Sequence, residues 1–244
     1  MPVENTSYFP YFAFFGWFLG LLFLSFLNER IWSRIFPGLK YRFFVAPGVI
    51  VHELSHALAC ILLLAPIRRI SFFSRAGGYV EHGRSRFGFL GQALIAMAPI
   101  FGITLFLWLL IYWFGFALEI KAVDFSSADP GATIAAFFRS AWDLAAANWS
   151  AWPFWIFIYL VISLVSALAP SKKDFQNAFA GLVFLFFLGL IIIYAGWGQH
   201  FLINLIGQYL GYIISLGLIW QAFSLIIGLP VYVVRKFFKT TRLQ

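Results

Sequence analysis

Two histidines and a glutamate form the pattern in this sequence that could do chemistry. His52, Glu53 and His56 make up an HExxH motif, a spacing at which a helix presents both histidines on one face. Each ring can then offer a nitrogen to the same metal ion, most often zinc. Glu53 is turned by about 100° from His52 around the helix, so it can reach a water molecule beside the metal but cannot be a ligand in the same geometry. The motif predicts zinc-dependent hydrolysis with Glu53 as the base.

A catalytic zinc ion needs a third protein ligand and one open position. Asp174 is the first candidate, because it begins an apolar segment on the predicted side of the membrane where the HExxH segment ends. A structural interpretation competes with this one, since Ser171 and Asp174 have the spacing of a helix-capping pair. Glu81 and His82 are the alternative ligands, and the other acidic residues are left open.

Three further residues have a possible role in binding substrate or in supporting the ligands. Asn177 follows Asp174 by one helical turn, where its amide could bind a ligand or a substrate carbonyl, or else serve helix packing. Gly77 and Gly78 lie between two short β-prone stretches within residues 67–82, a pattern that predicts a β-hairpin with a Gly-Gly turn. An extended peptide can add to the open edge of such a hairpin through main-chain hydrogen bonds.

The composition places the chain among membrane proteins. Of its 244 residues 62% are hydrophobic and 11% are charged, against about 25% charged in soluble domains. The net charge of +8 comes from Lys and Arg at the ends of apolar segments and in short loops, as in membrane proteins. We therefore expect a lipid bilayer and no nucleic acid among its partners. The chain has a single cysteine, Cys60, which excludes an intrachain disulfide. We expect Cys60 to be a small buried apolar residue.

The apolar segments predict an all-α polytopic membrane protein of about six transmembrane helices, with a short β-hairpin after the second and a single domain over residues 1–244. The six segments are residues 10–27, 43–65, 87–116, 152–169, 175–197 and a stretch within 201–234. Six spans put both termini on one side of the membrane. We expect that side to be the cytoplasm, because it receives the larger share of Lys and Arg.

Four stretches, residues 47–59, 69–80, 91–99 and 170–174, resemble the site-2 protease family of intramembrane zinc metalloproteases, in particular its small bacterial members. The resemblance covers residues 43–180, the core of a transmembrane metalloprotease-like domain. It implies that His52, His56 and Asp174 bind one zinc ion per chain and that Glu53 is the base. It also implies a substrate that is a transmembrane helix of another membrane protein, cut near the cytoplasmic face, and a location in a bacterial cytoplasmic membrane.

These observations support three hypotheses of different classes. The first is an intramembrane zinc endopeptidase. The second is a catalytically silent relative that binds membrane partners without cutting them. The third is a metal or proton transporter, which is disfavoured because the first, third and sixth segments carry almost no ionisable residues to form a continuous path. The sequence leaves the oligomeric state undetermined.

Overall fold

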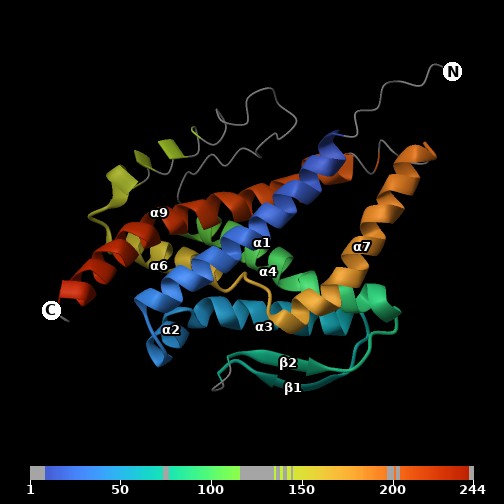
Figure 1. Cartoon of the computed structure of the whole chain (residues 1–244), viewed down its shortest axis with the longest axis horizontal. Coiled ribbons are helices and arrows are strands. Elements are labelled where there is room, and N and C mark those ends of the chain that lie inside the picture. The colour runs from blue at the N-terminus through green and yellow to red at the C-terminus, as the bar shows by residue number, and fades with distance from the viewer. Residues whose placement is uncertain are drawn as a thin grey trace.

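The structure is a computed structural model that describes residues 9–73, 77–115, 135, 138–139, 142–143, 145–196, 201 and 204–241. Helices dominate these residues, and a single antiparallel pair of strands follows the third helix (Figure 1). The elements are α1 (Phe9–Ile35), α2 (Leu39–Phe44), α3 (Ala46–Leu62), β1 (Ile67–Ser71), β2 (Tyr79–His82), α4 (Gly88–Phe114), α6 (Trp152–Ser166), α7 (Lys172–Tyr194), a π-helical turn η1 (Leu205–Leu210) and α9 (Gly211–Thr241). The predicted helical architecture and the hairpin are confirmed.

Four of the six predicted spans are long and apolar enough to cross a membrane, which supports a membrane protein. These four are Phe14–Ile35, Gly88–Phe114, Lys172–Tyr194 and Ile213–Phe238. The other two apolar helices, α3 with 17 residues and α6 with 15, are about 26 and 22 Å long and fall short of a hydrocarbon core of about 30 Å. Six complete spans are therefore not confirmed.

The first helix is longer than its predicted span because polar residues beyond residue 27 have partners on α9. The Asn28 amide donates to the carbonyl oxygen of Gln221 at 3.0 Å, and the Trp32 indole donates to the Ser224 hydroxyl at 2.9 Å. Figure 1 shows α1 and α9 lying side by side. Buried polar groups that find partners are tolerated inside a helix pair, so α1 continues to Ile35.

Close approaches between helices fix α3 within the fold. A Cβ atom at Gly48 would collide with the carbonyl oxygen of Ser163 on α6, and one at Gly102 on α4 would collide with the Ser55 hydroxyl. Small residues at such crossings allow helix backbones to come close together. The helix that carries the HExxH motif is thus clamped between α4 and α6.

The hairpin differs from its prediction in the form of its turn. Arg69 pairs with Glu81 and Ser71 pairs with Tyr79, so the connection runs over residues 72–78 and is not a tight Gly-Gly turn. The two glycines instead stand directly before β2. A Cβ atom at Gly78 would lie 2.7 Å from Cγ of Glu53, so the glycine lets the hairpin come close to α3. Figure 1 shows the hairpin running along α3, with the N-terminal end of α7 also reaching that helix.

Candidate metal centre

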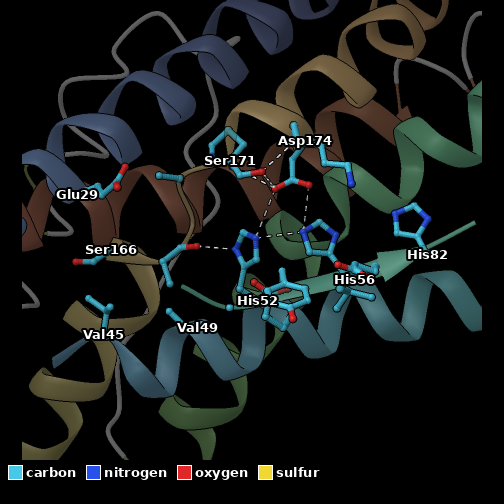
Figure 2. Close-up of a pocket in the computed structure, with 18 of the residues that line it drawn as sticks. Glu29, Val45, Val49, His52, His56, His82, Ser166, Ser171 and Asp174 are labelled. Atoms are coloured by element: carbon cyan, nitrogen blue, oxygen red, sulfur yellow. Dashed lines mark hydrogen bonds and ion pairs between the residues drawn. The ribbon is translucent and has the colours of Figure 1, made fainter. Parts of the chain in front are cut away.

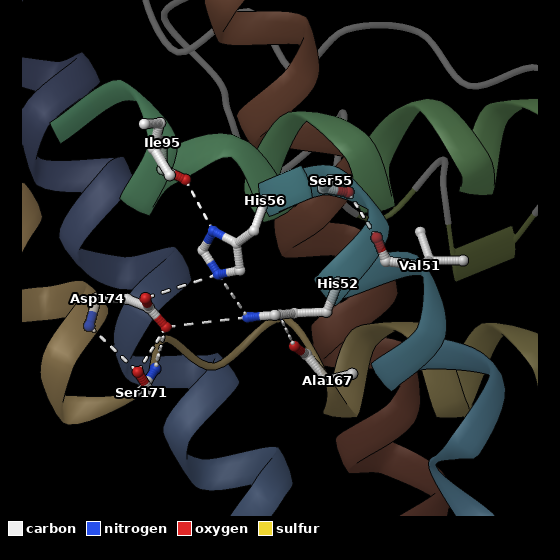
Figure 3. A network of polar contacts seen from close by, with 8 residues as sticks. All are labelled: Val51, His52, Ser55, His56, Ile95, Ala167, Ser171 and Asp174. Atoms are coloured by element: carbon white, nitrogen blue, oxygen red, sulfur yellow. Dashed lines mark hydrogen bonds and ion pairs between the residues drawn. The ribbon is translucent and has the colours of Figure 1, made fainter. Parts of the chain in front are cut away.

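Three side chains from two helices converge on one point. His52 and His56 come from α3 and Asp174 comes from the first turn of α7, and each offers a ligand atom within 4.8 Å of the others. The His56 Nε2 atom lies 3.6 Å from Asp174 Oδ1, and His52 Nε2 lies 4.0 Å from Asp174 Oδ2. The two Nε2 atoms are 3.2 Å apart (Figure 3). These residues form a possible metal-binding triad.

Backbone carbonyl groups hold both imidazole rings in the orientation that a metal requires. His52 Nδ1 lies 2.7 Å from the carbonyl oxygen of Ala167, and His56 Nδ1 lies 2.8 Å from that of Ile95. A carbonyl oxygen only accepts hydrogen bonds, so each Nδ1 carries the proton. In a neutral ring the lone pair is then on Nε2, and both lone pairs face the space beside the Asp174 carboxylate. Such hydrogen bonds from the far ring nitrogen are typical of metal-binding histidines.

The spacing of these atoms fits a small divalent cation. Tetrahedral zinc with bonds of about 2.0–2.1 Å separates neighbouring ligand atoms by about 3.3 Å. The Nε2–Nε2 distance of 3.2 Å and the His56–Asp174 distance of 3.6 Å lie close to this value. Two unprotonated nitrogens that face each other beside a carboxylate repel one another, and a bound cation removes that repulsion.

The structure supports both interpretations of Asp174. Its backbone N–H donates to the Ser171 hydroxyl oxygen at 3.1 Å, while its Oδ2 accepts from the Ser171 hydroxyl at 2.5 Å and from the Ser171 backbone N–H at 3.1 Å. This is the predicted capping box at the start of α7. The cap uses Oδ2 and leaves Oδ1 toward His56, so one carboxylate can serve both the helix and a metal.

A pocket of about 390 Å³ surrounds the triad and extends past it on both sides (Figure 2). Glu53 lines this pocket and is 6% exposed. The glutamate side chain packs against the backbone of Gly78, where a Cβ atom would lie 2.8 Å from Oε1. Gly77, which precedes it, has a positive φ of 111°, a conformation that glycine adopts readily. Gly78 therefore shapes the wall beside the predicted base, while Gly77 is not among the residues that line the pocket.

The remaining predicted site residues lie at or near the pocket but outside the triad. Glu81 and His82 line the pocket on β2, and His82 Nδ1 lies 2.9 Å from the carbonyl oxygen of Gly83. Asn177 is half-buried on α7 and is not among the residues that line this pocket. Cys60 is buried beside Ala65 and Ile95, as expected for a small apolar residue.

Several contributors to the site had no signal in the sequence. The carbonyl groups of Ala167 and Ile95 belong to unremarkable apolar residues, and backbone acceptors carry no sequence signature. Glu29, Tyr41 and Ser166 line the pocket, although they belong to no motif and come from three different parts of the chain. Only the fold brings them together.

Comparison of the chain with protein-family models, with curated proteins and with solved structures finds no match. The likeness to site-2 proteases therefore stays a prediction from the motifs, and the function has to be argued from the site itself.

Proposed function

We propose that this protein is a zinc-dependent endopeptidase that hydrolyses peptide bonds in or beside the transmembrane segments of membrane-protein substrates. The observation that carries the proposal is the convergence of His52, His56 and Asp174 in a pocket that Glu53 also lines. The triad supplies the three protein ligands that a catalytic zinc ion needs, and the pocket leaves room for a fourth group. The apolar helices around it support a membrane setting.

In the proposed reaction the triad holds the metal and Glu53 transfers the proton. A zinc ion held by the triad would act as a Lewis acid that polarises the substrate carbonyl group and makes a nearby water molecule more acidic. Glu53 accepts a proton from the attacking water as its oxygen bonds to the carbonyl carbon, and then delivers that proton to the amine nitrogen as the C–N bond breaks. Burial of Glu53 beside Gly78 restricts its side chain to the wall next to the triad.

The strand β2 offers a place for an extended substrate. Its four residues, Tyr79–His82, all line the pocket, and β1 is its one partner strand among the described residues. A peptide can pair with such a short sheet through main-chain hydrogen bonds. A substrate helix would therefore unwind locally and present its peptide bonds in extended form beside the triad.

The chain would lie in a bacterial cytoplasmic membrane as a multi-pass protein with both termini on the cytoplasmic side. The excess of Lys and Arg on the segments assigned to that side supports this orientation.

Reconstitution tests the proposal. The full chain, purified with its metal into lipid vesicles, is incubated with synthetic transmembrane peptides of varied sequence, and products are identified by mass spectrometry. We expect internal cleavage that stops after treatment with a zinc chelator and returns on addition of zinc. Cleavage that continues in protein shown to be metal-free would overturn the proposal, and so would stable capture of the peptides without cleavage by zinc-loaded protein.

A further inference from the structure

The pocket around the triad collects negative charge in a chain that is otherwise strongly basic. Four of the five acidic residues that the structure describes line it, namely Glu29, Glu53, Glu81 and Asp174, and the chain as a whole carries +8. Among the described lining residues Lys173 is the single Lys or Arg. Glu53 and Asp174 are accounted for by the proposed chemistry. Glu29 and Glu81 are not.

Glu29 lies at one end of the pocket together with a set of hydrogen-bonding groups. We use the term Glu29 arm for the part lined by Glu29, Tyr41, Val45 and Ser166. Figure 2 shows Glu29 on one side of the triad and His82 on the other. A peptide that passes the triad in extended form would therefore place a neighbouring side chain in the Glu29 arm.

Ser166 supplies an independent sign that the Glu29 arm takes a polar ligand. The residue is 2% exposed, and its hydroxyl has no hydrogen-bond partner among the described residues. Buried hydroxyl groups nearly always have a partner, and each exception needs an explanation. A ligand group that donates a hydrogen bond into the arm would satisfy the Ser166 oxygen and the Glu29 carboxylate together.

Tyr41 completes the arm with an aromatic ring and a hydroxyl. Burial, and after it the negative charge of Glu29, raise the pKa of the Tyr41 hydroxyl, so this group adds no second negative charge. A carboxylate beside a neutral phenol and an aromatic face is suited to an ammonium or guanidinium group.

We infer that the Glu29 arm binds a Lys or Arg side chain of the substrate close to the scissile bond. The inference rests on the proposed function and adds a substrate class to it: membrane proteins with a basic residue at the edge of a transmembrane segment. Such residues are frequent where segments meet the cytoplasm. The basic residues of α1 and α2 do not line the pocket among the described residues, and Arg34 is engaged with the Tyr232 hydroxyl at 3.2 Å.

Peptide binding tests this inference separately from catalysis. Zinc-loaded Glu53→Gln protein in micelles is titrated with fluorescent transmembrane peptides. Each peptide carries Lys, norleucine or Glu at one juxtamembrane position, and that position is moved along the segment from one peptide set to the next. We expect the best Lys peptide to bind roughly tenfold more tightly than its norleucine counterpart, as for a charge-assisted hydrogen bond. We expect Glu29→Gln in the same background to abolish that difference.

Two matched variants sharpen the result. Asp143→Asn removes an exposed acid outside the pocket and should leave the Lys preference intact. Glu81→Gln removes an acid at the opposite end of the pocket and should leave the preference intact as well. Equal binding of Lys and norleucine peptides at all positions, or no binding of any peptide, would overturn the inference. A Lys preference that survives Glu29→Gln would also overturn it, and so would a preference that is lost in Glu81→Gln or Asp143→Asn. If the unsubstituted protein shows the preference but cuts none of the peptides, the proposed hydrolysis fails and the Glu29 arm stands.

Discussion

The Nδ1 atom of His52 lies 2.7 Å from the carbonyl oxygen of Ala167, just after the end of α6. The same short connection leads to Ser171 and Asp174 at the start of α7. The connection between α6 and α7 therefore orients His52 through Ala167 and also places the Asp174 carboxylate beside it. This coupling explains how an aspartate more than a hundred residues away along the chain reaches the HExxH helix.

Removal of the Ser171 hydroxyl should weaken metal binding, because that group holds Oδ2 of Asp174 at 2.5 Å. We expect Ser171→Ala to bind zinc about tenfold more weakly, the lower end of what such supporting contacts contribute. Competition with a chelator of known affinity measures the change, and Ser171→Thr should restore it. Ser33→Ala, which removes a hydroxyl at the end of α1, is the control. Unchanged affinity in Ser171→Ala would show that the cap does not orient the ligand.

The identity of the third ligand can be read from metal content. Asp174→Ala should lose zinc after dialysis, since two histidines alone leave the ion under-coordinated. Glu81→Gln and His82→Ala should retain about one zinc per chain, because their side chains lie outside the triad. Elemental analysis of the three purified variants decides the matter. Zinc retained in Asp174→Ala and lost in either β2 variant would assign the ligand to the hairpin.

Gly78 should matter for catalysis more than for the metal. A Cβ atom there would lie 2.7 Å from Cγ and 2.8 Å from Oε1 of Glu53, so Gly78→Ala must push the glutamate or the hairpin aside. We expect peptide cleavage to fall at least about tenfold while zinc content stays unchanged, as happens when a catalytic group is misplaced by a fraction of an ångström.

Gly16→Ala is the matched control for that substitution, because a Cβ atom at Gly16 meets nothing within 4 Å and alanine favours a helix. Its cleavage rate should equal that of the unsubstituted protein. A Gly78→Ala protein that cuts at the full rate would show that the close contact with the hairpin does not position Glu53.

The buried amides of Asn28 and Gln221 should stabilise the bundle as a pair. The Asn28 amide donates to the Gln221 side chain and backbone, and the Gln221 amide donates to the Ser25 hydroxyl at 2.7 Å and to the carbonyl oxygen of Val165 at 3.0 Å. Alanine at either position should lower the unfolding free energy by about 1–3 kcal/mol, the cost of leaving a buried partner unsatisfied.

A double-mutant cycle of Asn28→Ala and Gln221→Ala, followed by unfolding in micelles, measures the coupling. The combined loss should be smaller than the sum of the single losses, since both variants break the same contact. Gln176→Ala, at an exposed position of α7, should change stability little. Strictly additive losses would show that the two amides act independently.

The parts of the site that follow from local geometry were predictable from the sequence. His52 and His56 share a helix face because of their spacing, and the Ser171–Asp174 cap depends on residues within one turn. The long apolar segments that became α4 and α7 were predicted close to their observed bounds, since a run of apolar residues of that length favours a membrane helix.

The parts that depend on contacts between distant segments were not predictable. The extension of α1 to Ile35 relies on partners on α9. Helix α6 ends at Ser166, three residues before its predicted end, and the next residue, Ala167, contacts His52 on α3. Gly78 was predicted to lie in a tight turn. In the structure the need for glycine at this position comes from the side chain of Glu53, which lies 25 residues earlier in the chain. Such contacts leave no periodic pattern in a single sequence.

The most direct test measures zinc content and peptide cleavage on one preparation of Glu53→Gln in lipid vesicles, beside the unsubstituted protein. Glu53 lines the pocket but is not a member of the triad, so glutamine should leave the ligands in place and remove only the proton acceptor. We predict about one zinc per chain in both proteins, with cleavage of the transmembrane peptide lost in the variant. Unchanged cleavage by zinc-loaded Glu53→Gln would contradict the proposed function.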